Sequence, residues 1–94
     1  MNYQVEISQS GRGGSINYTE DEQPLRLDWE FATDGAYVFV PTPEQWDAYW
    51  QSNNIHWAVG RRQEILDRVA AEVRQQKAQS SEVTIEDNCI HFRF

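Results

Sequence analysis

Residues 59–78 read VGRRQEILDRVAAEVRQQKA and carry the longest helical pattern in the chain. Their apolar side chains recur every three or four residues, which draws one apolar stripe along a helix. Polar side chains recur every four residues on another face of the same helix. The two patterns predict an amphipathic helix that packs one face on the protein and turns the other to water. The apolar positions are Ile65, Leu66, Val69, Ala70 and Val73, and the polar ones are Glu64, Arg68, Glu72 and Gln76.

Alternating apolar and polar residues upstream of this helix predict four strands. The first two flank the glycine-rich segment Gly11–Gly14, and a turn at Arg12-Gly13 would pair Ile7 with Tyr18. An alternative is a flexible loop that binds an anion. It is not a P-loop, because the Gly-Lys-Ser/Thr ending is missing.

The next two strands surround Asp34-Gly35, a dipeptide that favours a tight hairpin turn. Residues 25–31 alternate strictly between apolar and polar side chains, as a half-buried strand does. A turn centred on Asp34-Gly35 would pair Phe31 with Val38 on one face. By the same register it would place Trp29 against Val40.

A short helix is predicted to follow these strands. Thr42 is a suitable N-cap and Pro43 a suitable first helical residue, and the pattern ends near Gln51. This helix would place Trp46 and Trp50 one turn apart.

The end of the chain predicts a last hairpin with a turn at Asp87-Asn88. One register matches apolar with apolar and acid with base, which supports the pairing. The order is therefore four strands, two helices and two strands. We expect one α+β domain over residues 1–94, with a largely antiparallel sheet and one long amphipathic helix packed on one face. The pairs would be Ile85 with Ile90, Val83 with Phe92, and Glu82 with Arg93.

The composition of the chain argues against a disulfide-bonded, secreted or membrane-spanning protein. One cysteine, Cys89, allows no intrachain disulfide, and residues 1–8 lack a signal-peptide pattern, so we expect a cytoplasmic protein. No apolar run is long enough to span a membrane.

The net charge is -7, and residues 1–58 hold nine acidic and two basic residues. This field would repel nucleic acid and anionic lipid and attract a basic partner, although acidity also serves solubility alone.

Several residue sets are candidates for a chemical site. Cys89, His91 and His56 are the soft metal ligands of the chain, one short of a usual zinc site, and no motif marks a catalytic pair. Asp28 and Glu30 share the polar face of one strand, where solvated surface is favoured over acid–base chemistry. We therefore expect no metal, no cofactor and no enzymatic activity.

Aromatic residues offer a second kind of site. Tyr37 and Phe39 lie on the face opposite the predicted core, where they are either covered by a second layer or exposed as a binding patch. Four aromatic residues form a cluster in and after the short helix. We expect them to pack in the core, and a binding interface is the alternative. Arg61-Arg62 beside this cluster either pair with nearby acids or contact something outside the chain. The cluster comprises Trp46, Tyr49, Trp50 and Trp57.

A set of loosely spaced residues comprises the segment Gly14–Glu20, Leu25, Leu27, Glu30, the segment Val38–Val40, Trp46, Arg62, Ile65, Leu66, Val83, Ile85 and Glu86. This set resembles a family of small bacterial immunity proteins, which are encoded beside polymorphic toxins. The resemblance covers about residues 14–86. It implies a non-enzymatic cytosolic inhibitor that binds a toxin domain, and it carries no residue-level site.

The leading hypothesis is a protein-binding module that neutralises a basic toxin by occlusion through an acidic face. One alternative is a small-molecule-binding or enzymatic domain with a pocket between helices and sheet, which would use His56, His91, Cys89 and Arg62. Another is a structural homodimer. The candidate partner-binding residues are Glu20, Asp21, Glu22, Asp28, Glu30, Asp47, Tyr37 and Trp46.

Overall fold

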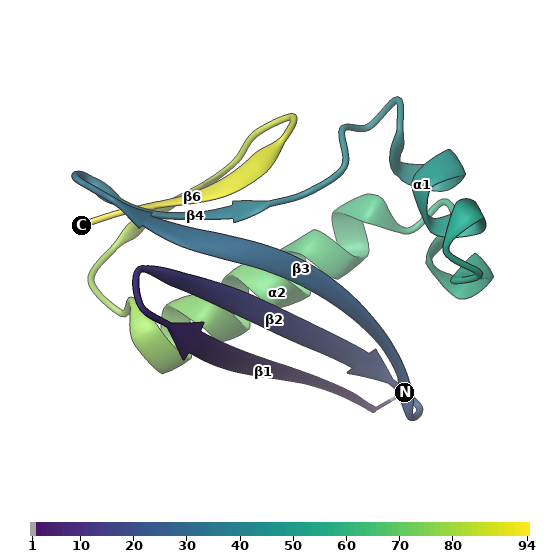
Figure 1. Cartoon of the computed structure of the whole chain (residues 1–94), viewed down its shortest axis with the longest axis horizontal. Coiled ribbons are helices and arrows are strands. Elements are labelled where there is room, and N and C mark those ends of the chain that lie inside the picture. The colour runs from purple at the N-terminus through teal and green to yellow at the C-terminus, as the bar shows by residue number, and fades with distance from the viewer. Residues whose placement is uncertain (1) are drawn as a thin grey trace.

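The structure is a computed structural model that describes residues 2–94. Six strands form one antiparallel sheet in the order β1-β2-β3-β4-β6-β5, and the helices lie between β4 and β5 in the chain (Figure 1). The predicted α+β fold and order of elements are confirmed. The strands are β1 Tyr3–Ser10, β2 Gly13–Glu20, β3 Gln23–Ala32, β4 Gly35–Phe39, β5 Glu82–Ile85 and β6 Cys89–Arg93; the helices are α1 Trp46–Ser52, the 3-10 helix η1 His56–Ala58 and α2 Arg62–Lys77.

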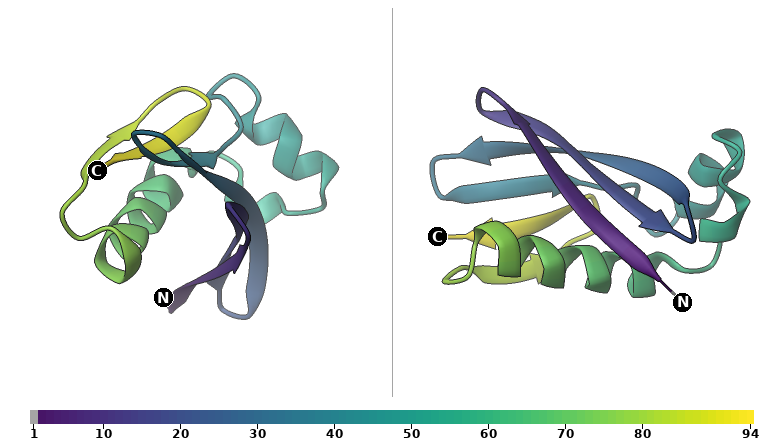
Figure 2. Two further views of the ribbon diagram at one scale, coloured as in Figure 1. Left: turned by 60° about the vertical axis from the view of Figure 1, so that its left-hand side comes forward. Right: turned by 90° about the horizontal axis from the view of Figure 1, so that it is seen from below.

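Helix α2 is the element around which the sheet curls. It contacts β1 on one side and β5 and β6 on the other, so the sheet wraps the helix (Figure 2). The helix begins at Arg62 rather than near Val59, because Gly60 adopts a φ of +74°, outside the right-handed helical region. The predicted apolar stripe is confirmed, since its members are all buried: Ile65, Leu66, Val69, Ala70 and Val73.

The polar stripe of α2 does not turn wholly to water, and that prediction is wrong. Arg68 reaches over to β2, and its guanidinium lies 3.2 Å from the carboxylate of Glu20. The side-chain amide of Gln76 donates a 3.0 Å hydrogen bond to the carbonyl oxygen of Val5 on β1. These contacts exist because the curled sheet brings its first two strands beside the helix.

The last hairpin has the predicted register. Strands β5 and β6 pair around the turn at Asp87-Asn88, as both the apolar pattern and the charge pattern indicated. The confirmed pairs are Ile85 with Ile90, Val83 with Phe92, and Glu82 with Arg93.

The predicted register of the first hairpin is wrong by two residues. The turn is at Gly11-Arg12, so Ile7 faces Ile16 rather than Tyr18. Gly11 has a φ of +64° at the first central position, which is what a type II′ turn requires. A shift of two residues leaves every side chain on its predicted face.

The β3–β4 hairpin is shifted in the same way. Ala32 pairs with Gly35, so the turn residues are 33 and 34 and Gly35 belongs to the strand. Trp29 therefore faces Val38 rather than Val40, and Phe31 faces Ala36. The glycine is used for close packing against β6 and not for the turn.

The short helix starts later than predicted, at Trp46 instead of Pro43. The backbone N–H of Gln45 still donates to the hydroxyl oxygen of Thr42 at 3.3 Å, within a turn that precedes the helix. Trp46 and Trp50 meet edge to face with their ring centroids 5.4 Å apart, as their spacing predicted.

Within residues 2–94, neither α-helix combines the length and the apolar character needed to cross a membrane.

Candidate functional site

The face of the sheet that points away from α2 carries three of the predicted partner-binding residues, Asp28, Glu30 and Tyr37, together with Phe39. Core residues of β3 and β4 alternate with these positions, so their side chains point outward. The register places Asp28 opposite Phe39 and Glu30 opposite Tyr37. We call Asp28, Glu30, Tyr37 and Phe39 the acidic–aromatic face.

One half of the acidic–aromatic face is ordered by ring stacking. The rings of Tyr37 and His91 stack with centroids 4.2 Å apart and planes 5° from parallel. The Tyr37 hydroxyl donates a 3.5 Å hydrogen bond to Asp34, whose carboxylate also lies 3.5 Å from the Nε2 of His91. Partial burial and the charge of Asp34 raise the pKa of Tyr37, which keeps its phenol protonated. These contacts orient the Tyr37 side chain on the outer face of β4.

The other half of the acidic–aromatic face combines exposed aromatic rings with charged side chains. Phe39 is 44% exposed and Tyr49, on α1, is 48% exposed, although both are large aromatic residues. They border the same shallow hollow, together with Asp28 and Arg26. The guanidinium of Arg26 lies 3.3 Å from the Asp28 carboxylate, and both side chains are well exposed. Aromatic side chains flanked by charges are the composition of a protein-binding hot spot.

Two predicted partner-binding residues are internal, and those predictions are wrong. Trp46 is 1% exposed, and its indole N–H donates a 2.8 Å hydrogen bond to the carbonyl oxygen of Ala58. Glu20 is 4% exposed and lies on the helix-facing side of β2. Neither side chain is available to a partner.

Glu20 is the centre of a buried ionic cluster. Arg61 donates two 2.7 Å hydrogen bonds to its carboxylate, one to each oxygen. Arg68 approaches the same group at 3.2 Å, and the Tyr18 hydroxyl donates a further hydrogen bond to it. Arg61 in turn pairs with Glu64 at 2.9 Å. The cluster joins β2 to the start of α2, which accounts for Arg61 but not for its neighbour Arg62.

The electrostatics of the cluster favour structure over acid–base chemistry. Burial, assisted by the hydrogen bond to Glu20, raises the pKa of Tyr18 to about 12. Burial alone would raise the pKa of Glu20, but the hydrogen bonds from Arg61 and Tyr18 and the arginine charges lower it below its usual value. Near neutral pH the phenol is therefore protonated and the carboxylate ionised. Neither group is poised to exchange a proton.

The remaining predicted acids lie outside the acidic–aromatic face. Asp21 and Glu22 form the exposed turn between β2 and β3, beside a hollow at the start of β1. Asp47 lies on α1, where its carboxylate accepts a 2.8 Å hydrogen bond from the backbone N–H of Gly60. The predicted acids thus do not form one continuous patch.

The turn between β2 and β3 is strained, and this leads to a first prediction. Asp21 and Glu22 have φ values of 47° and 71°, a conformation that favours glycine and costs other residues about 1 kcal/mol each. Glu22→Gly is expected to raise the free energy of unfolding by about 0.5–1 kcal/mol, because glycine adopts this φ without a Cβ clash. Urea denaturation would measure the change. Glu22→Ala is the control, because it removes the same carboxylate and keeps the strain; equal stability of the two variants would contradict the explanation.

The soft ligands and basic residues considered for catalysis do not converge. Cys89 and His91 lie on the outer face of β6, whereas His56 lies in η1, the short helix that follows α1. Arg62 donates hydrogen bonds to the carbonyl oxygens of Pro41 and Asp87. Burial raises the pKa of the Cys89 thiol, which disfavours the reactive thiolate. Within residues 2–94, no three His, Cys, Asp or Glu side chains are grouped as a metal site.

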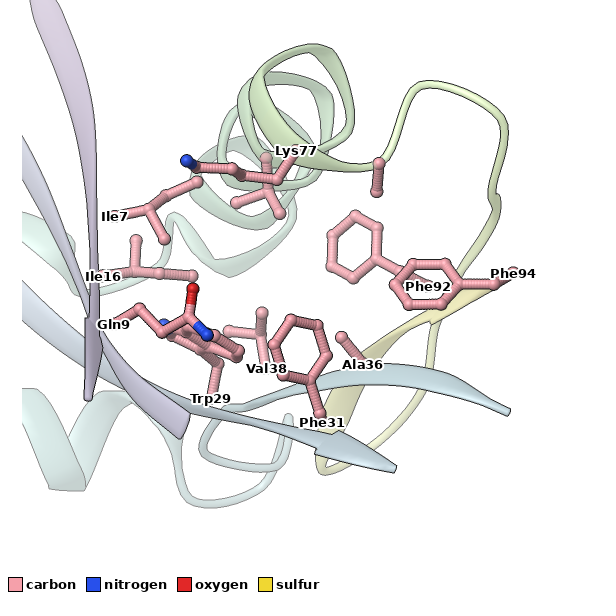
Figure 3. A pocket seen from close by; sticks show the side chains of 12 residues that line it. Ile7, Gln9, Ile16, Trp29, Phe31, Ala36, Val38, Lys77, Phe92 and Phe94 are labelled. Atoms are coloured by element: carbon pink, nitrogen blue, oxygen red, sulfur yellow. The ribbon is translucent and has the colours of Figure 1, made fainter. Parts of the chain in front are cut away.

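An apolar cavity opens at the end of the domain where α2 terminates (Figure 3). None of the residues proposed for a pocket lines it, so that version of the small-molecule hypothesis is wrong. Its walls come instead from β1, β2, β3, β4, β6 and the last turn of α2. Sequence patterns missed this cavity because its residues look like ordinary core positions.

Phe39 and Tyr49 belong to two separate aromatic sets in the sequence, and no local pattern predicts them as one site. They come from β4 and α1, and only the packing of α1 beside the sheet brings them to a common hollow.

Comparison with known proteins adds no further assignment. No protein-family model, no curated protein and no solved structure matches the chain.

Proposed function

We propose that the chain is a non-enzymatic protein-binding module that docks a basic partner on the acidic–aromatic face. In this proposal it is a cytoplasmic immunity protein, and it neutralises a toxin domain by covering the toxin's basic surface. The observation that carries the proposal is the exposure of Phe39 and Tyr49 around one hollow beside Asp28.

The geometry of this face suits a protein more than a small substrate. The hollow is open and has no buried polar group to orient a small molecule, whereas two exposed rings can anchor a flat contact. Asp28 and Glu30 then lie around the rings, in the position of an interface rim. Rim charges act mainly on the rate of association and on the choice of partner.

The charge of the chain supports a basic partner. The net charge is -7, and the whole excess comes from residues 1–58, which include β3 and β4. Asp34 and Glu86 add negative charge near the stacked pair of Tyr37 and His91. A toxin domain that acts on nucleic acid would present a complementary basic surface.

A homodimer through Tyr37 and Phe39 is less well supported. A two-fold interface places the same patch on both subunits, so Asp28 and Glu30 would approach their own copies. Like charges placed together disfavour association. Light scattering at several protein concentrations separates the two readings, since the proposal expects one monomer mass throughout.

The proposal predicts that charge reversal on this face abolishes partner capture. Wild-type protein and an Asp28→Lys/Glu30→Lys variant would be used to capture proteins from the source cell's lysate at low and at high salt. A basic toxin-like partner should bind the wild type at low salt, weaken as salt rises, and fail to bind the variant. Phe39→Ala should weaken the same complex about 30-fold, as loss of a hot-spot ring does.

The matched control is Asp67→Lys/Glu72→Lys, which makes the same change of charge on α2. It should retain the partner if the face is the binding site and lose it if net charge alone matters. A partner that binds both double variants equally would show that the contact is elsewhere. Recovery of no protein at either salt concentration would contradict a protein-binding role.

A further inference from the structure

The apolar cavity has the size and lining of a small-ligand site. Its volume is about 140 Å³, and it is open to solvent on one side. An engineered apolar cavity of about 150 Å³ in another protein binds benzene, so this volume accommodates one aromatic ring or a short branched acyl group. Side chains that form most of the wall are Ile7, Ile16, Trp29, Phe31, Val38 and Phe92.

Two polar side chains stand on one side of this cavity. Lys77, in the last turn of α2, and Gln9, on β1, lie on the side of the cavity opposite Phe92 and Phe94 (Figure 3). The amide nitrogen of Gln9 is held by a 3.0 Å hydrogen bond to the carbonyl oxygen of Gly11. Within residues 2–94, the Lys77 ammonium forms no ion pair, and the cavity wall contains no Asp or Glu.

We propose that this cavity binds a small amphipathic monocarboxylate, with an aromatic ring or short acyl group inside and its carboxylate on the Lys77 ammonium. This site is independent of the acidic–aromatic face, because it lies on the helix side of the sheet. The carboxylate would gain a charge-assisted hydrogen bond at the solvent-exposed rim.

The lining excludes other classes of small ligand. A sugar would leave its hydroxyl groups unpaired against the apolar wall, which is costly. A cation would be repelled by Lys77 and would find no carboxylate in the wall. The ring has an apolar, aromatic environment, and the single cation selects an anionic head group.

Trp29 supplies a direct reporter of occupancy, because its indole forms part of the cavity wall. The probe is hydrocinnamate, a benzene ring joined by a short chain to a carboxylate. Its amine counterpart, phenylpropylamine, has the same ring and chain with the opposite charge. Titrations would follow the NMR shift of the Trp29 indole N–H and the backbone amide shifts of β1, β3 and α2, because fluorescence would sum over all four tryptophans. We expect hydrocinnamate to bind in the high-micromolar to millimolar range, as suits a ligand of this size.

Two variants test separately whether the cavity holds the ring and whether Lys77 binds the carboxylate. Ala36→Phe fills the cavity and should abolish binding; Ala71→Phe, on the exposed side of α2, is the matched control and should leave it unchanged. Lys77→Met keeps the apolar stem and removes the charge, which should weaken hydrocinnamate binding about fivefold. If Ala36→Phe does not fold, Ala78→Phe fills the same space from the helix side.

Each outcome decides one part of the proposal. Amide shifts confined to the cavity wall, lost in the filled variant and weakened by Lys77→Met, would support it. Equal binding of hydrocinnamate and phenylpropylamine would overturn the role of Lys77. Absence of any shift with hydrocinnamate at millimolar concentration, or binding that survives the filled cavity, would overturn the site itself.

Discussion

Gly35→Ala is expected to lower the free energy of unfolding by about 3 kcal/mol or more, because backbone strain and a steric clash act together. Gly35 has a φ of +150°, which L-residues rarely adopt. A Cβ at this position would overlap the carbonyl oxygen of Phe92 and lie 2.9 Å from its carbonyl carbon. Both atoms belong to the backbone of β6, so no side chain can rotate away. Urea or thermal denaturation of the purified variant measures the loss.

Gly60→Ala is the control for this prediction. Gly60 also has a positive φ, +74°, but nothing lies within 4 Å of an added Cβ. Its substitution should cost about 1 kcal/mol, from backbone conformation alone. Equal losses at Gly35 and Gly60 would show that contact with β6 does not contribute.

Glu20→Gln is expected to destabilise the protein by about 2–3 kcal/mol near neutral pH. The amide keeps the size of the side chain but leaves the Arg61 and Arg68 guanidinium groups without their buried counter-charge. Arg61 and Arg68 are 22% and 25% exposed, so water offsets part of the cost, which places it below that of a fully buried ion pair. Glu64→Gln is the control: its carboxylate is 43% exposed, and its loss should cost under about 1 kcal/mol.

The same variant gives a pH dependence with a defined sign. Folding lowers the pKa of Glu20, so its ionised form stabilises the folded state above the ordinary value of 4.5. This stabilisation is lost as the pH falls through the lower pKa of the folded protein. The difference in unfolding free energy between wild type and Glu20→Gln should therefore shrink below pH 4.5. A difference that grows in acid would contradict the assignment.

Local patterns were sufficient for the elements but not for every register. The β5–β6 register was predicted because Val83 with Phe92 and Glu82 with Arg93 satisfy two independent criteria in one alignment. At the β3–β4 turn, Asp34-Gly35 matched a common hairpin dipeptide, and this misplaced the turn. The need for a glycine there arises from β6, which is distant in the sequence.

The candidate functional site was harder to predict than the registers, because it depends on contacts between residues distant in the sequence. Alternation places Glu20 on the same face as Tyr18, but its charge suggested a surface position. Its burial depends on Arg61, 41 residues away, which no local period reveals. The order of the strands was equally hidden, and it is the pairing of β4 with β6 that sets Tyr37 on His91. Phe39 and Tyr49 meet only after α1 packs.

The position of α2 in the chain has a consequence for biosynthesis. Strands β1 to β4 are made before the helix they wrap, so a growing chain presents the apolar side of this meander with its covering element still missing. Strand β6, which pairs with β4, is made later still. Such long-range pairings slow folding and expose intermediates to aggregation. The nascent polypeptide should therefore be a chaperone client until its last hairpin has been translated.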